Sequence, residues 1–398
     1  MDEAAASAKL NVVLFPWLAF GHMIPYLELA KRLAARGHAV TFLSTPRNVA
    51  RLPPVPADLS PRVRLVALPA PVVDGLPEGA ESTADVPPEK QELLKKALDG
   101  LAAPFAAFSR TPLPTTAAWI AFLGPRWAQA AHPRTTLEDF TAPPRWCPSF
   151  PSAVAYRRHE AGWAVDAFQP NASGVSDIER MWQIIERARF TIYRSCDEVE
   201  PGVFALLTDL FRKPAIPAGG PLAARPCRWR RQLPLSWQPP KSTIYVALGS
   251  EAPLTACNLH ELALGLELAG VRFLWAFRKP SGMSAPTNTD VAELLPAGFE
   301  DRTRGHGLVW SGWVHRASSH GRWRSGASAW RWRGTRETAR LAGDSVAAAV
   351  RSVMVEEQGK VFASNAERLK QALRDQRRQD QYMDELVGYL KRYKDDSC

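Results

Sequence analysis

A histidine close to the N-terminus is the first residue whose type and position could support chemistry. His22 lies in the sequence PWLAFGHMIP, shortly after a continuous apolar run at residues 11–15. An imidazole at the carboxyl end of a buried strand can act as a general base toward a hydroxyl group, and Gly21 allows close backbone approach. A loop histidine without a chemical role is the alternative, and the residues by themselves leave both interpretations open.

A glycine and a serine in the second half of the chain are the next candidates. Gly249 and Ser250 follow the apolar sequence TIYVA at residues 243–247. The glycine frees the turn, and the serine hydroxyl together with nearby backbone amides can hold a phosphate group at the end of a strand. Many turns between strands and helices contain Gly-Ser, so this pair alone is a weak signal for a phosphate site.

Alternating strand and helix patterns indicate how these residues are positioned. The run NVVLF at residues 11–15 is typical of a strand buried on both faces of a parallel sheet. Pro25 opens a predicted helix that Gly37 closes, and strands are expected at residues 39–44 and 64–68. Strand, helix and strand at this spacing predict an α/β fold with a doubly wound sheet.

The same pattern continues toward the C-terminus in two blocks. Residues 214–221 are rich in Pro and Gly and predict a linker between the blocks. Further strands are expected at 190–194, 243–248 and 272–277, and helices at 89–108, 177–189, 198–210, 259–269, 344–356, 360–375 and 379–393. Two α/β halves joined by a linker predict a ligand crevice at the carboxyl ends of the strands.

The net charge raises a nucleic-acid hypothesis. The 398 residues include 50 Lys and Arg against 40 Asp and Glu, and 23% are charged, which excludes a disordered or fibrous chain. The whole excess of +10 lies in residues 225–237 and 313–340, which together hold 11 Arg and one acidic residue. Arginine interleaved with tryptophan can bind single-stranded nucleic acid, but RWRSGASAWRWRG has neither helical nor strand periodicity. We therefore expect no specific nucleic-acid binding.

Cysteine spacing and hydropathy bear on metals and membranes. Five scattered cysteines predict neither a disulfide framework nor a zinc site. The apolar stretch at residues 10–20 is too short to cross a bilayer, and it follows Asp2 and Glu3 instead of the positive charge of a signal peptide. We expect a cytoplasmic protein with no metal and no membrane span.

Three longer segments together resemble plant family-1 UDP-glycosyltransferases. They are NVVLFPWLAFGHMIPYLELAKRLAARGHAVTFLSTPRN, FTIYRSCDEVEPG and KSTIYVALGSEAPLTACNLHELALGLELAGVRFLWAFRKP. The chain is similar to the subgroup that adds glucose or rhamnose to a sugar already present on a flavonoid or terpenoid. The combination of segments is specific, and the similarity covers well over half of the chain.

The resemblance implies a GT-B-like α/β fold of two Rossmann-like, doubly wound domains that face a crevice, the second of them incomplete. It places an acceptor-side domain at residues 1–213, a linker at 214–240 and a donor-side domain at 241–375. Residues 376–398 would form a terminal helix that packs back on the first domain. The implied reaction is inverting transfer from UDP-glucose or UDP-rhamnose to a small-molecule glycoside, with the UDP-sugar as co-substrate.

The resemblance also assigns roles to individual residues. His22 corresponds to the general base that deprotonates the acceptor, and Phe20 and Gly21 lie on the acceptor side. On the donor side, Gly249 and Ser250 correspond to groups near the diphosphate, and Trp313 corresponds to the indole that stacks on uracil.

The chain departs from the family after Trp313. The signature core of the family, Thr-His-Cys-Gly-Trp-Asn-Ser, is absent, and about thirty unrelated residues replace roughly seventy before the family pattern resumes near Asp344. Arg- and Trp-rich runs are expected when codons for Ala, Val and Gly are read out of register. We therefore expect frame-shifted or mis-spliced sequence at residues 313–343 and 225–237.

A third departure affects the partner of the histidine. The family has a strand near residues 109–136 that carries an aspartate, but no acidic residue occurs between Asp99 and Glu138 here. Neither Glu138 nor Asp139 is expected to reach His22. Because losing the orienting carboxylate of a comparable triad costs about 10⁴ in turnover, we expect little catalysis from this chain. Binding of the acceptor without catalysis is the alternative function.

Overall fold

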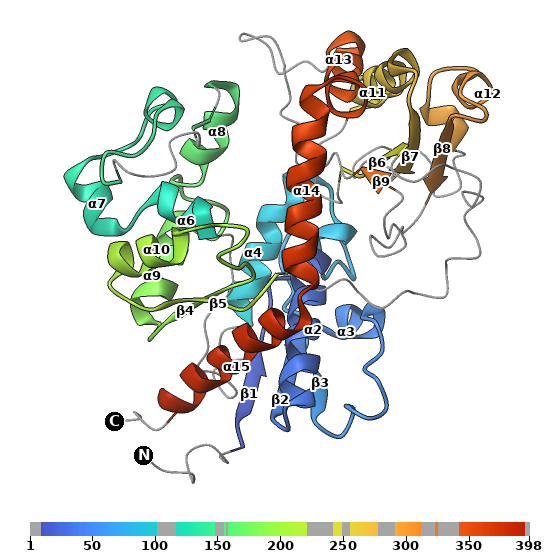
Figure 1. Cartoon of the computed structure of the whole chain (residues 1–398). Coiled ribbons are helices and arrows are strands. Elements are labelled where there is room, and N and C mark those ends of the chain that lie inside the picture. Colours follow the sequence, from blue (N-terminus) through green and yellow to red (C-terminus); the bar gives the residue numbers. More distant parts are fainter. Residues whose placement is uncertain are drawn as a thin grey trace. The chain divides into compact units, whose positions relative to one another are not determined.

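The chain forms two compact units, which are described separately below. The computed structural model describes residues 9–101, 117–147, 155–156, 158–220, 242–248, 255–277, 291–311, 323–324 and 342–394 (Figure 1). Unit 1 comprises residues 1–222 and 373–398, and unit 2 comprises residues 223–372. The N-terminal and C-terminal segments of the chain therefore belong to the same unit.

Unit 1 begins with a parallel sheet in the order β1-β2-β3. The strands are β1 (Asn11–Leu14), β2 (Ala39–Ser44) and β3 (Val63–Ala67), with Leu14 opposite Phe42 and Phe42 opposite Leu65. Helix α2 (Phe20–Ala35) connects β1 to β2, and α3 (Pro46–Arg51) follows β2. Because the strands are parallel, the segments that follow β1, β2 and β3 all leave the same edge of the sheet.

The predicted start of the first helix is wrong. Helix α2 begins at Phe20, five residues before Pro25, which lies inside the helix. Met23 is fully buried and extends the apolar face of Tyr26, Leu27 and Ala30 by one turn toward the N-terminus of the helix. Burial of this extra turn outweighs the usual preference of proline for the first helical position. The first turn of α2 therefore carries the residues that were expected on a loop.

A second, two-stranded parallel sheet follows later in unit 1. It pairs β4 (Thr191–Tyr193) with β5 (Ala215–Pro217) and lies after α9 (Asp177–Arg187). Helix α10 (Val203–Phe211) connects the two strands and begins five residues later than predicted. The left-handed backbone of Gly202 at its N-cap ends the preceding turn, which explains the late start.

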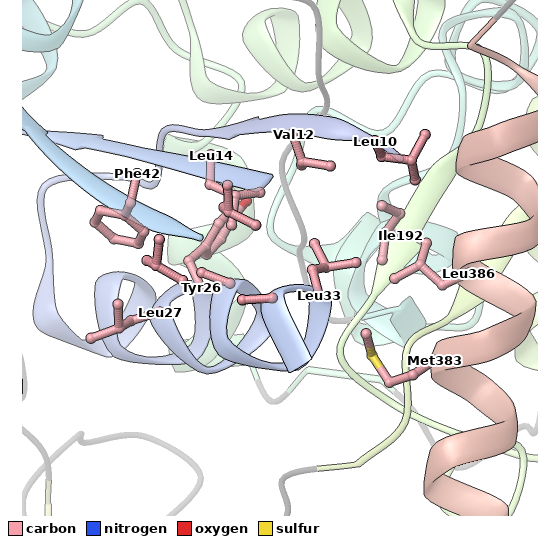
Figure 2. Packing of buried hydrophobic residues seen from close by; sticks show 14 of the residues in the cluster. Leu10, Val12, Leu14, Tyr26, Leu27, Leu33, Phe42, Ile192, Met383 and Leu386 are labelled. Atoms are coloured by element: carbon pink, nitrogen blue, oxygen red, sulfur yellow. The ribbon is translucent and has the colours of Figure 1, made fainter. Parts of the chain in front are cut away.

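The C-terminal helix α15 (Gln376–Arg392) completes the core of unit 1. Figure 2 shows apolar side chains from the β1 region, α2, β4 and α15 meeting in one cluster. Met383 and Leu386 of α15 are at most 1% exposed and belong to the same cluster as Leu33 and Ile192. Full burial of such side chains stabilises a fold by about 1.5–3 kcal/mol each, so α15 is an integral part of this unit.

Several short helices cover the middle of unit 1. The helix predicted at 89–108 is divided into a 3-10 turn η2 (Pro88–Lys90) and α4 (Gln91–Gly100), and its remainder extends outside the described residues. The described part of the expected strand region 109–136 is helical, with α6 (Ala117–Leu123) and α7 (Arg126–Ala131). The remaining short elements of this unit are η1 (Thr83–Asp85), η3 (Glu138–Thr141) and α8 (Arg158–Asp166).

Unit 2 contains a four-stranded parallel sheet in the order β8-β7-β6-β9. Its strands are β6 (Thr243–Val246), β7 (Arg272–Phe277), β8 (Gly307–Ser311) and β9 (Trp323–Arg324). From β6, the chain adds β7 and then β8 on one side of the sheet and places β9 on the other side of β6. The strand order therefore reverses between β6 and β9. Strand β9 lies in the Arg- and Trp-rich segment, where no strand pattern was expected.

Helices pack on this second sheet. Helix α11 (Ala256–Ala269) connects β6 to β7, and α13 (Gly343–Met354) packs closely against it through Gly265 and Val346. The buried cluster of this unit includes Phe273, Trp275 and Phe299. The other elements are η5 (Val291–Leu294), α12 (Phe299–Arg302) and α14 (Gln358–Arg374), whose last two residues belong to unit 1.

Candidate functional site

His22 lies in the first turn of α2, at the edge of the sheet where the parallel strands end. Its backbone N–H donates to the carbonyl of Ala19 at 2.9 Å, and the residue is exposed. A neutral imidazole can accept a proton from a hydroxyl group that approaches it. The position suits a base that meets its substrate from solvent.

The two residues before His22 differ in their surroundings. Gly21 is exposed, and a Cβ atom built there would meet no heavy atom within 4 Å beyond its chain neighbours and the backbone of its own helix. Phe20 is partly buried against the core, and the guanidinium carbon of Arg51 lies 4.8 Å from the centre of its ring. Space is therefore open at the Gly21 position, and a charged side chain covers Phe20.

The start of α2 is held by a distant segment of the chain. Ala19 at the N-cap offers no side-chain hydrogen bond, and the first turn has no acidic residue. The backbone N–H of Thr83 donates to the carbonyl of Leu18 at 3.0 Å. This links the loop before α2 to the 3-10 turn η1, which follows β3 by fifteen residues.

Sequence reasoning missed the polar residues around η1. Arg51 of α3 donates to both carboxylate oxygens of Asp85, at 2.8 and 2.9 Å. Burial opposes the ionisation of Asp85, but hydrogen bonds from Arg51, Ser82 and the Glu81 amide outweigh it and lower its pKa. The sequence Ser-Thr-Ala-Asp at 82–85 is a readable capping box, whereas the pairing with Arg51 needs the fold.

The two acidic residues considered as partners of His22 make local contacts. The carboxylate of Asp139 accepts hydrogen bonds from the backbone N–H groups of Thr135 and Thr136, at 2.9 and 2.8 Å. Glu138 forms an ion pair with Arg158 of α8. These contacts stabilise the turn that leads into η3.

The donor-side candidates Gly249, Ser250 and Trp313 lie outside the described residues. The structure does describe the strand that precedes Gly249 and Ser250. This strand is β6, and it ends at Val246. This strand borders the position where the strand order reverses, and in open α/β sheets ligands bind at the carboxyl ends of the strands around such a position. The prediction of a donor site after β6 therefore has a topological reason.

Neither a metal cluster nor a membrane segment is found among the described residues. Within these ranges, no three His, Cys, Asp or Glu side chains group closely enough to hold a metal ion. The helices of the described part include none that is long and apolar enough to cross a bilayer. Cys147 and Cys196 are buried and Cys257 is exposed, and none of these three forms a disulfide.

Solved structures define the class of fold. The chain is similar to UGT2 of Phytolacca americana in complex with UDP-2-fluoro-glucose and pterostilbene, with a TM-score of 0.63 and 20% identity over 96% of this chain and 99% of that one. It is also similar to a UDP-glucosyltransferase from Polygonum tinctorium, with a TM-score of 0.64 and 21% identity over 97% of this chain and 99% of that one. The fold is therefore the GT-B fold of plant glycosyltransferases, as predicted.

Sequence relatives define the family. The chain is 35% identical to UDP-glycosyltransferase 91A1 of Arabidopsis thaliana over 98% of both chains. It is 32% identical to soyasaponin III rhamnosyltransferase of Glycine max over 79% of this chain and 74% of that one. No protein-family model matches the sequence. The chain belongs to the plant family-1 UDP-glycosyltransferases, whose co-substrate is a UDP-sugar, and the predicted resemblance is confirmed.

The alignment also measures how much of the relative is missing. It extends over 472 positions, whereas this chain has 398 residues, so at least 74 positions of UDP-glycosyltransferase 91A1 face a gap here. Gaps of this total length agree with segments of family sequence having been lost.

Proposed function

We propose that this UDP-glycosyltransferase transfers glucose or rhamnose from the UDP-sugar to a hydroxyl group of a flavonoid or terpenoid glycoside, with inversion at the anomeric carbon. The supporting observation is the placement of His22, exposed on the first turn of α2 and beside the open space at Gly21. The similarity to a rhamnosyltransferase that is named for a saponin supports this donor and acceptor class.

The proposed reaction is a single displacement. The imidazole of His22 takes the proton of the acceptor hydroxyl as the oxygen forms a bond to the anomeric carbon. The bond from that carbon to the diphosphate oxygen breaks, and UDP leaves with the electron pair. Attack from the face opposite to UDP inverts the anomeric configuration.

Residues of the acceptor side and the donor side have separate roles in this proposal. Phe20 and Gly21 lie on the acceptor side, and the absence of a side chain at Gly21 leaves room for the acceptor. Gly249 and Ser250 bind the diphosphate, and Trp313 stacks on uracil. Stacking contributes about 1–3 kcal/mol, whereas micromolar to submillimolar affinity requires about 5–8 kcal/mol. Since the signature core of the family is absent, the chain should bind UDP with a dissociation constant of about 1 mM or weaker and turn over slowly.

A second candidate function is acceptor binding without transfer. The gap of at least 74 positions against UDP-glycosyltransferase 91A1 favours it, since the sequence that is absent after Trp313 includes the donor signature. The buried core of unit 1 and the first turn of α2 support acceptor binding that does not require the donor side.

Titration and product analysis distinguish the two candidates. The purified chain is titrated by calorimetry with UDP and with a flavonoid glycoside, and product formed from UDP-glucose or UDP-rhamnose is followed by mass spectrometry. Slow product formation together with millimolar UDP binding supports the first proposal. Acceptor binding with no product supports the second candidate, and a low-micromolar dissociation constant for UDP contradicts the loss of donor recognition. Absence of acceptor binding contradicts both.

A further inference from the structure

Three separate segments meet at the start of α2, and each depends on the others for its position. The loop before α2 has no cap of its own, because Ala19 offers no side-chain hydrogen bond. The N–H of Thr83 on η1 donates to the carbonyl of Leu18 in that loop. Helix α3 supplies the third segment through the side chains of Asn48 and Arg51.

The guanidinium of Arg51 uses all its nitrogen atoms in this junction. Its Nη1 and Nη2 donate to the two carboxylate oxygens of Asp85 at 2.8 and 2.9 Å. Nη2 also lies 2.8 Å from Asn48 Oδ1 and 3.2 Å from Ser82 Oγ, and Nε donates to the carbonyl of Arg47 at 3.1 Å. A planar, five-donor group is required for this set, and the single ammonium of a lysine cannot reproduce it.

The face of the same guanidinium covers Phe20. Its central carbon lies 4.8 Å from the centre of the ring, which is the geometry of a cation–π contact. Phe20 is the first residue of α2 and stands two residues before His22. A helical turn is rigid, so a displacement of Phe20 also displaces the backbone of His22.

The acceptors of the junction are themselves fixed. The Asp85 side chain is only 6% exposed, and its Oδ2 also accepts from the N–H and the hydroxyl of Ser82, at 2.9 and 2.8 Å. Asn48 is fully buried and donates to the carbonyl of Glu81 at 2.6 Å and to the hydroxyl of Thr45 at 2.8 Å. Arg51 therefore lies against a preorganised set of oxygens and not against a flexible surface.

We propose that Arg51 and Asp85 are positioning residues for the glycosyl transfer: their ion pair, packed on Phe20, fixes the first turn of α2 and thereby the direction of the His22 imidazole. The catalytic part of this inference rests on the proposed function of His22. The structural part, that the pair fixes the helix start, stands independently of whether the chain transfers sugar.

Hydrogen exchange of the full-length chain tests the structural part. Arg51→Met keeps most of the side-chain volume and removes the donors, and Asp85→Asn keeps the shape and removes the charge. The exposed Arg62 supplies the control, as Arg62→Met. The amides of His22 and Met23, which donate to the carbonyl of Ala19, should exchange at least about tenfold faster in the first two variants than in the control.

The amide of Ala30 separates a local effect from general unfolding. Ala30 lies in the buried middle of α2 and should exchange at an unchanged rate in all variants. Equal acceleration at Ala30 and at His22, or no acceleration at His22, overturns the inference. Arg51→Lys provides a folded variant that retains the charge. Its exchange rate at His22 and Met23 should lie between those of the wild type and Arg51→Met, because lysine lacks the planar set of guanidinium donors.

Steady-state kinetics test the catalytic part. If the wild-type chain forms product, Arg51→Met should lower kcat at least about tenfold while the acceptor KM changes by less than about threefold, and Arg62→Met should behave like the wild type. An equal fall in both Arg variants overturns the catalytic part. If the wild type forms no product, the proposed function fails, and the exchange rates at His22 and Met23 alone decide whether the pair fixes the helix start.

Discussion

The hydroxyl of Tyr382 donates a hydrogen bond of 2.9 Å to the carboxylate of Glu198, two residues that are 184 positions apart. Arg378 donates to the same carboxylate at 2.8 Å, and its guanidinium also lies over the Tyr382 ring. These contacts attach α15 to the loop after β4. The C-terminal helix thus completes a core that is otherwise built from residues 10–218.

The Glu198 contact predicts a loss of stability in acid. Burial opposes ionisation of this carboxyl, but the hydrogen bonds from Arg378 and Tyr382 prevail and lower its pKa to about 2. A lowered pKa contributes stability that is present above the ordinary value of 4.5 and is lost as the pH falls from there toward 2. The contribution should be about 1–3 kcal/mol at neutral pH.

Urea unfolding of Glu198→Gln at pH 7, 4 and 3 measures this contribution. The variant should be less stable than the wild type at pH 7, and the difference should shrink as the pH falls. The exposed Glu78, as Glu78→Gln, is the control and should follow the wild type. A constant difference between Glu198→Gln and the wild type over this pH range would show that ionisation of Glu198 does not stabilise the fold.

Arg134 should be essential to the fold around α6 and α7. The residue is 5% exposed, and its guanidinium donates to the carbonyls of Phe122, Asp139 and Ala142 at 2.8–2.9 Å. Burial lowers its pKa to about 10, and backbone dipoles stabilise the charge in place of water. Because the compact ammonium of a lysine lacks the planar set of donors with which the guanidinium reaches these separated carbonyls, Arg134→Lys should cost about 2–4 kcal/mol in unfolding free energy.

The matched control for Arg134 is the exposed Arg145, as Arg145→Lys. Chemical denaturation followed by tryptophan fluorescence compares the two variants. We expect the Arg145 variant to lie within about 0.5 kcal/mol of the wild type. Equal stability of the two variants would refute the structural role of Arg134.

A substitution at Gly265 tests how closely α11 packs on α13 in unit 2. A Cβ atom at this position would lie 2.4 Å from Cβ of Val346 and 2.7 Å from the carbonyl oxygen of Gly343. The helices would have to move apart, so Gly265→Ala should destabilise the chain by about 1–3 kcal/mol. Gly388 of α15 has open space around it, and Gly388→Ala should instead be stabilising by up to about 1 kcal/mol. A thermal shift of the same sign for both variants would contradict this packing.

Gly21 tests whether the acceptor approaches the first turn of α2. Since open space surrounds it, Gly21→Ala should change the unfolding free energy by less than about 0.5 kcal/mol. The added methyl group should weaken binding of the acceptor glycoside several-fold in a calorimetric titration. Unchanged acceptor affinity in a folded Gly21→Ala variant would exclude approach at this position.

The elements that sequence patterns predicted best are the buried strands. Strand β7 has the predicted bounds, and β1 ends one residue earlier than predicted. The prediction succeeds because a short, continuous apolar run is compatible with few structures other than a buried strand. The start of α2 was missed because the burial of Met23, a tertiary contact, overrides the local signal of Pro25. The family resemblance was confirmed by relatives that match nearly the whole chain.

The candidate site was only partly accessible to sequence reasoning. His22, Phe20 and Gly21 were found because they follow the first strand, and their roles remain predictions. The pair of Arg51 and Asp85 was missed because 34 residues separate the partners and only the folded sheet edge brings them together. The donor residues Gly249, Ser250 and Trp313 also remain predictions.

The initial rate of sugar transfer by the wild type and by His22→Ala tests the central claim most directly. Product from UDP-glucose or UDP-rhamnose and a flavonoid glycoside is measured by mass spectrometry, with the exposed His132, as His132→Ala, for comparison. The wild type and His132→Ala should form product at equal, slow rates, and His22→Ala should be at least about a hundredfold slower, as expected on losing a general base. Transfer by His22→Ala at the wild-type rate would contradict the account.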